Sequence, residues 1–162
     1  MKFTQQQLSG GLAVTHPTLI ILRGLPGAGK SSWIRERYIN VTPFDLAPPD
    51  FDGPVTVSAD HYFTNLNGEY LFDPRKLGAA HSAAQCNLVK ALKANKTLVF
   101  VDNTHTTKWE YALALELGRA FGYDTNVVSL FDGGCTDEEL FERNTHGVPL
   151  ETIQAMRERW ES

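Results

Sequence analysis

Residues 18–31 read TLIILRGLPGAGKS, and this stretch decides the fold. Its first five residues, Thr18 to Leu22, are apolar or β-branched and predict a buried strand. The glycines that follow fit the spacing Gly-x-x-x-x-Gly-Lys-Ser, which ends at Ser31. Glycines let the backbone curl so that several N–H groups point at one phosphate, a geometry that side chains would obstruct. The stretch therefore predicts a phosphate-binding loop (P-loop) between a strand and a helix, in preference to a turn that only connects the two.

The residues of this loop also indicate its ligand. The Lys30 ammonium can reach β- and γ-phosphate oxygens, and the Ser31 hydroxyl can bind Mg²⁺. The helix that follows presents its positive end to the phosphates. We therefore expect ATP with magnesium as the donor. The predicted nucleotide-binding residues of the loop are Gly24, Leu25, Pro26, Gly27, Ala28, Gly29, Lys30, Ser31 and Ser32.

Strands and helices alternate along the rest of the chain. Apolar runs predict further strands at 55–58, 97–101 and 125–130. Periodicity, caps and punctuation predict helices at 32–40, 73–95, 107–121 and 136–143, and from about 149 to the end. Four prolines in the connection 41–54 predict that it has no regular structure. The alternation predicts an α/β fold, a three-layer sandwich with a mainly parallel sheet whose active groups lie at the carboxyl ends of the strands.

Composition limits the classes of function. With 162 residues, 42% hydrophobic, the chain fits one soluble domain at 18–162 after an N-terminal segment, residues 1–17. No apolar run suits a membrane span or a signal peptide, so a cytoplasmic location is expected and a membrane partner is not. Cys86 and Cys135 form no zinc or disulfide pattern. The formal net charge of -4 argues against a large basic face, so any nucleic-acid contact should be short and local.

Acidic side chains follow two of the predicted strands. Asp60 can accept the proton of an attacking hydroxyl and orient it toward the γ-phosphoryl group, although an ordinary loop aspartate is the alternative. Asp102 closes an apolar run and, with Ser31, can hold the magnesium, unless it only caps the next turn. Asn103 stands where a motor ATPase usually has a glutamate that activates water. Transfer to a bound acceptor is therefore favoured over hydrolysis.

Two further regions can complete the site. Arg143 ends a predicted helix before a segment punctuated by Gly147 and Pro149, and an arginine there can fold over the nucleotide, or else form a surface salt bridge. Tyr62, Phe63 and nearby Tyr70 can stack on a base, or the loop can simply bury its own aromatic side chains.

Four blocks in this order resemble the kinase domain of phage-type polynucleotide 5'-hydroxyl kinases and their stand-alone relatives. They are GLPGAGKSS at 24–32, SADHYF at 58–63, VDNTH at 101–105, and Arg143-Asn144 with Gly147-Val148-Pro149. The resemblance implies a P-loop kinase-like fold with a helical lid, and the host cytoplasm as location if a phage encodes the chain. It implies that Lys30 and Ser31 bind donor phosphates and metal, that Asp60 is the general base and that Arg143 is the lid arginine. By the same resemblance, Asn103, Thr104 and His105 line the acceptor side.

One position departs from that family. In the phage enzyme an arginine stands three residues after the catalytic aspartate and grips the acceptor's phosphate, whereas this chain has Phe63. The departure leaves room for a hydroxymethylpyrimidine of phage DNA, such as 5-hydroxymethyluracil, as acceptor, with Tyr62 and Phe63 holding an extruded base. A kinase of nucleosides, sugars or metabolites is a further alternative. A nucleotide switch is not favoured, because residues 95–98 read NKTL and lack the aspartate of an Asn-Lys-x-Asp motif. A nucleic-acid hydroxyl, most directly a polynucleotide 5'-OH end, remains the leading prediction.

Overall fold

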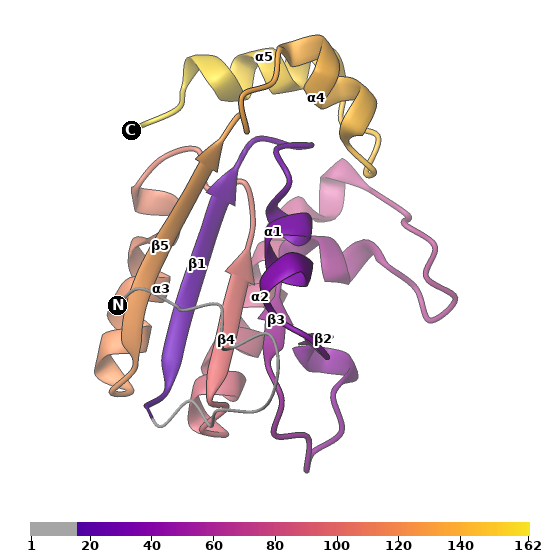
Figure 1. Cartoon of the computed structure of the whole chain (residues 1–162). Helices are drawn as coiled ribbons and strands as arrows, with labels where there is room; N and C mark the ends of the chain where they lie inside the picture. Colours follow the sequence, from indigo (N-terminus) through magenta and orange to yellow (C-terminus); the bar gives the residue numbers. More distant parts are fainter. Residues whose placement is uncertain (1–15) are drawn as a thin grey trace.

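The computed structural model describes residues 16–162, and its centre is a five-stranded sheet in the order β2–β3–β4–β1–β5 (Figure 1). All neighbouring strands run parallel, with Thr18 to Leu22 of β1 opposite Leu98 to Asp102 of β4. The predicted N-terminal segment lies outside the described residues except for its last two. The strands are β1 Thr18–Gly24, β2 Thr42–Pro43, β3 Val55–Val57, β4 Leu98–Asp102 and β5 Asp124–Phe131.

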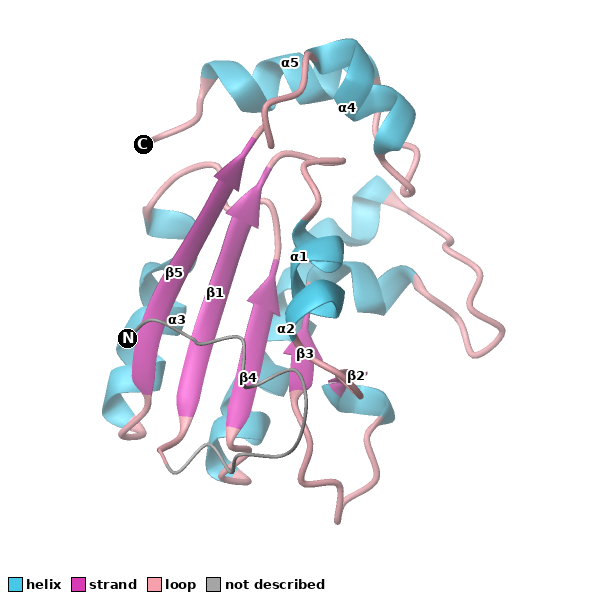
Figure 2. Cartoon of the chain, in the orientation of Figure 1, coloured by secondary structure: helices cyan, strands magenta, loops and turns pink. Residues whose placement is uncertain are grey.

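Helices lie on both faces of the sheet and across one end of it (Figure 2). They are α1 Lys30–Arg37, α2 Leu77–Lys93, α3 Trp109–Ala120, α4 Asp137–Arg143 and α5 Leu150–Glu158, with 3-10 turns at Phe44–Leu46, Ala59–Phe63 and Pro74–Lys76. Within residues 16–162, none of the helices has the length and apolar character needed to cross a bilayer.

Alternate residues of β1 pack on opposite faces of the sheet. Leu19 and Ile21 join a cluster that contains α2, α3 and the neighbouring strands β3 and β4. Ile20 and Leu22 pack with Ile34 of α1 on the other face. All four β1 side chains have zero exposure, and burial of each stabilises the fold by about 1.5–3 kcal/mol. The predicted three-layer α/β sandwich is therefore confirmed, and its sheet is entirely parallel among the described residues.

The lid consists of α4 and α5, which lie across the carboxyl ends of β1 and β5 (Figure 1). Leu140 of α4 and Ile153 of α5 pack against Leu25 and Ala28 of the P-loop. Arg157 of α5 adds polar contacts with the segment that leads into α4. Its guanidinium donates to the carboxylates of Asp132 at 2.6 Å and Asp137 at 2.7 Å, and to the Cys135 carbonyl at 2.8 Å. The lid thus continues the core directly above the P-loop.

The structure corrects two local predictions. Residues 41–54 are not without regular structure, because they contain β2 and a 3-10 turn; Pro43 is tolerated in β2 because this strand is at the sheet edge. The spacings Thr107-x-x-Glu110 and Thr136-x-x-Glu139 are both typical of capping boxes at helix starts. The box is complete at Thr136, whereas α3 begins after Lys108. At Thr107 the N–H and the hydroxyl both donate to the Glu110 carboxylate, and the Glu110 N–H donates to the Thr107 carbonyl instead of the hydroxyl.

Candidate functional site

The P-loop is held by backbone hydrogen bonds from the strand ends on either side of it. The Gly24 N–H donates to the Thr104 carbonyl beyond β4 at 3.0 Å, and the Leu25 N–H donates to the Phe131 carbonyl of β5 at 2.8 Å. Thr104, predicted on the acceptor side, therefore supports the P-loop through its backbone. The Ala28 N–H donates within the loop to the Leu25 carbonyl at 3.0 Å. Glycine-rich loops of this kind turn their other N–H groups toward a phosphate.

Two glycines bring the P-loop and the lid into close contact. Gly27 has φ +80°, and a Cβ at this position would collide with the backbone carbonyl oxygen of Leu140 in α4. Gly29 has φ +97°, and a Cβ there would lie 3.8 Å from the Arg143 guanidinium. Arg143 also donates to Cys135 Sγ at 2.8 Å. The predicted lid arginine therefore lies beside the P-loop, where its charge can reach phosphates.

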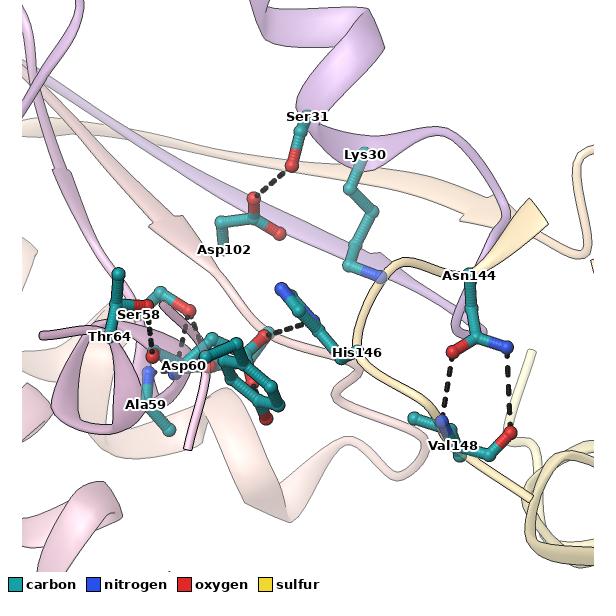
Figure 3. Close-up of polar contacts among 12 residues, drawn as sticks. Lys30, Ser31, Ser58, Ala59, Asp60, Thr64, Asp102, Asn144, His146 and Val148 are labelled. Atoms are coloured by element: carbon teal, nitrogen blue, oxygen red, sulfur yellow. Dashed lines mark hydrogen bonds and ion pairs between the residues drawn. The ribbon is translucent and has the colours of Figure 1, made fainter. Parts of the chain in front are cut away.

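Lys30, at the start of α1, points its ammonium group into the site (Figure 3). Its Nζ donates to the carbonyl oxygens of Gly24 at 2.9 Å and Leu25 at 3.3 Å. Burial lowers the pKa of Lys30, and the charges of Asp102 and Asp60 oppose that shift. A cation enclosed in this way can exchange its carbonyl contacts for the oxygens of a phosphate.

Ser31 and Asp102 provide oxygen atoms next to Lys30 (Figure 3). The Ser31 hydroxyl donates to Asp102 Oδ2 at 3.3 Å. Burial raises the pKa of Asp102, while the Lys30 charge opposes the shift. A hydroxyl and a carboxylate fit Mg²⁺, which binds oxygen ligands and usually keeps several waters beside one or two carboxylates and substrate phosphates. In the described part of the chain, no group of three or more His, Cys, Asp or Glu side chains could hold a metal ion.

Asp60 lies on the 3-10 turn that follows β3. Its N–H donates to the Ser58 hydroxyl at 3.2 Å, and the Ala59 N–H donates to Asn103 Oδ1 at 3.0 Å. Ser58 also donates to that Asn103 oxygen at 3.4 Å. Asn103, predicted on the acceptor side, thus connects the end of β4 to the turn that carries Asp60.

The Asp60 carboxylate has two side-chain partners that the sequence did not indicate. Tyr70 Oη donates to Oδ1 at 3.0 Å, and His146 Nδ1 lies 3.3 Å from Oδ2. Burial alone would raise the pKa of Asp60, but the hydrogen bond and charge of His146, with Tyr70 and Lys30, lower it. An aspartate held ionised at neutral pH can accept a proton. His146 had no sequence signal, because only the position of the lid brings it to a residue 86 positions earlier.

Two predicted acceptor side chains, Phe63 and His105, are buried in this structure. Phe63 is 5% exposed, with its ring edge-on to those of Tyr70 and Phe72. His105 is 6% exposed, its Nδ1 is 2.9 Å from the Leu22 carbonyl oxygen, and burial lowers its pKa to about 4. The interior contains both because each completes packing beneath the site.

The accessible aromatic surface lies around Phe63 instead. Tyr62 is 46% exposed and Phe72 is 50% exposed. Tyr62 also lines a pocket, together with Phe63, Thr64, Asn65, Leu71 and Lys76. The exposed rings of Tyr62 and Phe72 can stack on a planar group of a ligand, and the Lys76 ammonium group can bind an anion.

Comparisons with known proteins identify a family and a curated relative of this chain. The model of the AAA domain family matches residues 19–162. NEDD4-binding protein 2 from Homo sapiens is 33% identical over an alignment of 148 residues that covers 88% of this chain and 8% of that protein. The chain therefore corresponds to a small part of that curated relative.

Solved structures share the fold. One chain of the Pnkp1/Rnl/Hen1 RNA repair complex matches with a TM-score of 0.61 and 21% identity, over 93% of this chain and 46% of that one. A chain in another structure of the Pnkp1/Rnl/Hen1 complex matches with a TM-score of 0.54 and 24% identity, over 79% and 39%. The P-loop beneath its lid and the family match over residues 19–162 lead to one conclusion: this chain belongs to the AAA domain family and has a kinase-like P-loop fold.

Proposed function

We propose that the protein is an ATP-dependent kinase that transfers the γ-phosphoryl group to a hydroxyl of a nucleic acid, most directly a polynucleotide 5'-OH end. The observation that carries the proposal is the position of Asp60. The positive charge of Lys30, beside the P-loop, lowers the pKa of the Asp60 carboxylate. The same carboxylate accepts a hydrogen bond from Tyr70, which belongs to the loop that carries the exposed rings. A proton acceptor between a phosphate site and an aromatic surface supports transfer rather than nucleotide binding alone.

In this proposal the donor phosphates lie on the P-loop amides, and the cations of Lys30 and Arg143 stabilise the charge on the transferred group. Ser31 and Asp102 would hold the magnesium ion, which supplies further charge neutralisation when bound. Asp60 accepts the proton of the acceptor hydroxyl while the acceptor oxygen bonds to the γ-phosphorus and the bond to ADP breaks. Exclusion of water is supported by the lid, whose α4 backbone contacts the P-loop at Gly27.

The nucleic-acid acceptor is supported by the surface next to Asp60. The exposed rings of Tyr62 and Phe72 can stack on bases, and Lys76 can pair with a backbone phosphate. The patch is small, in keeping with a chain of net charge -4 and with a short, local contact. The fold shared with a chain of an RNA repair complex is consistent with this class of substrate.

A second candidate acceptor is the hydroxymethyl group of a pyrimidine in DNA. The observation that favours it is the buried ring of Phe63, three residues after Asp60, where the resembled kinases have a phosphate-binding arginine. Without a charged group at that position, the aromatic surface can hold an extruded base instead of a 5' end.

An acceptor screen with radiolabelled ATP tests both candidates. The acceptors are 5'-hydroxyl DNA and RNA oligonucleotides, DNA containing 5-hydroxymethyluracil, free nucleosides and a control without acceptor, each also measured with Lys30→Ala. Label on 5'-hydroxyl oligonucleotides supports the leading proposal, and label only on hydroxymethyl DNA replaces it with the second candidate. Label confined to nucleosides contradicts a nucleic-acid acceptor, and label that appears only as free phosphate contradicts a kinase.

A further inference from the structure

The lid carries a tight loop that presents one side chain to the site. Residues 144–148 form this loop, in which the Asn144 side chain donates to the Phe141 carbonyl at 2.7 Å and accepts from the Val148 N–H at 2.9 Å. Gly147 has φ +65°, which lets the chain reverse inside the loop. Figure 3 shows Asn144 joined to Val148 and His146 directed at Asp60. The position of His146 is therefore fixed to the position of the lid.

His146 and Tyr70 also contact each other. Their rings stack with centroids 4.3 Å apart and planes inclined by 23°. The Tyr70 ring also packs against two other rings. It is nearly parallel to that of Phe72, with centroids 6.3 Å apart, and edge-on to that of Phe63, with centroids 6.0 Å apart. Three residues from separate parts of the chain thus form a closed triangle in which each side chain contacts the other two.

We propose that His146 and Tyr70 are positioning residues for Asp60, and that His146 couples closure of the lid to the orientation of the general base. The inference rests on the proposed function, because it assumes that Asp60 is the base. It adds that the lid controls the acceptor half of the reaction as well as the donor half. When the lid moves away, Asp60 loses the contact that holds one of its two oxygens.

The geometry leaves room for the acceptor. An ionised carboxylate has about four lone-pair sites, and Tyr70 and His146 use one on each oxygen of Asp60. An acceptor hydroxyl can therefore donate to Asp60 while both contacts remain. The phenol stays a donor, because burial and the Asp60 charge raise the pKa of Tyr70.

Several charged or titratable groups face the pair formed by Asp60 and His146. Lys30 of α1 acts on both members, Asp102 of β4 acts on His146, and His61 lies on the same turn as Asp60. The hydrogen bond to Asp60 raises the pKa of His146, and burial opposes that shift. The same contact lowers the pKa of Asp60, so its loss should raise that pKa and move the acidic limb of the pH–rate profile to higher pH. Because Asp60 and His146 interact, the acidic limb of the pH–rate profile reports an apparent pKa of the two groups together.

A titration of the full chain without nucleotide tests the contact directly. NMR of the imidazole signals follows each histidine with pH, and assignment comes from the loss of one signal in His146→Asn. We expect His146 to titrate above the ordinary histidine range in the wild type and to return toward that range in Asp60→Asn. The exposed His81 on α2 is the matched control, because its signals should be unaffected by Asp60→Asn. An unshifted His146 in the wild type would overturn the proposal.

Kinetics then separate positioning from a merely structural role. His146→Ala should lower kcat by about tenfold, less than the loss of the base itself, and shift the acidic limb to higher pH. His146→Asn, whose amide nitrogen lies near the place of Nδ1, should recover part of kcat, and His81→Gln should change neither quantity. A rate lowered equally at every pH, with no recovery by asparagine, would mean that His146 only supports the fold. If Asp60→Asn keeps full activity, the proposed function itself loses its base; if Asp60→Asn is inactive and His146→Ala is normal, only this inference fails.

Discussion

The donor side and the acceptor side of the site are built by different means. On the donor side, a continuous run from β1 into α1 supplies the P-loop backbone and the side chains of Lys30 and Ser31. On the acceptor side, Tyr70 from a later loop and His146 from the lid contact Asp60, and Asn103 beyond β4 holds the turn that carries it. A P-loop made from adjacent residues tolerates little variation, whereas an acceptor site assembled from distant side chains can change its substrate through single positions such as Phe63.

The largest expected effect lies on the donor side. Lys30→Ala should lower transfer by about 10³-fold on every acceptor, because it removes a buried charge that contacts the P-loop. The measurement is single-turnover transfer from radiolabelled ATP, with the exposed Lys93→Ala as the matched control. A loss confined to one class of acceptor would break the division between the two sides, since Lys30 would then act on the acceptor.

Asp60→Asn should lower kcat by about 10²-fold or more and leave ATP affinity nearly unchanged. The amide keeps the shape of the carboxylate but cannot accept the hydroxyl proton. Titration with a fluorescent ATP analogue beside steady-state kinetics gives both quantities. Should ATP affinity collapse while kcat holds, Asp60 would belong to the donor side.

Alanine substitutions at two glycines with positive φ, one on each side of the site, allow the two sides to be compared by their effect on the free energy of unfolding. Gly27 of the P-loop has the Leu140 carbonyl against it, whereas Gly68 of the acceptor-side loop has φ +81° and no atom within 4 Å of the place that a Cβ would take. Both alanine substitutions carry the left-handed backbone cost of about 1–2 kcal/mol. Gly27→Ala should destabilise by about 2 kcal/mol more, because overpacking against the lid adds to that cost. Urea unfolding measures the difference, and equal losses would mean that the lid is not held against the P-loop in solution.

Sequence could predict the donor side because its information is local. The strand, the loop spacing and the helix start are encoded by neighbouring residues, and the structure places Lys30 and Ser31 as those patterns indicate. Asp102 joins them from β4, because β4 runs parallel to β1 and ends at the same edge of the sheet. The alternation of strands and helices likewise predicted the layers, while β2 was missed because two residues at a sheet edge leave no periodic signal.

The acceptor side depends on contacts that no local pattern encodes. The pairing of His146 with Asp60 follows from the position of the lid over the sheet. Phe63 and His105 have residue types that suit a ligand surface, but the packing of Phe72 and the Leu22 carbonyl draws them inside. Burial of single side chains after a strand end is decided by long-range packing, so a motif can identify such a segment without saying which of its side chains are open.

The smallest expected effect distinguishes the open rings from the buried one. Tyr62→Ala should raise the acceptor KM about fivefold, in line with loss of about 1 kcal/mol of stacking, and leave the KM for ATP unchanged. Phe63→Ala should instead lower the melting temperature, because that ring is 5% exposed and packs in the aromatic cluster. Steady-state kinetics with the acceptor found in the screen, beside thermal unfolding, measure the two outcomes. The assignment would be reversed if Tyr62→Ala bound acceptor normally while Phe63→Ala kept its stability and lost acceptor affinity. That result would mean that the loop opens to expose Phe63 when the acceptor binds.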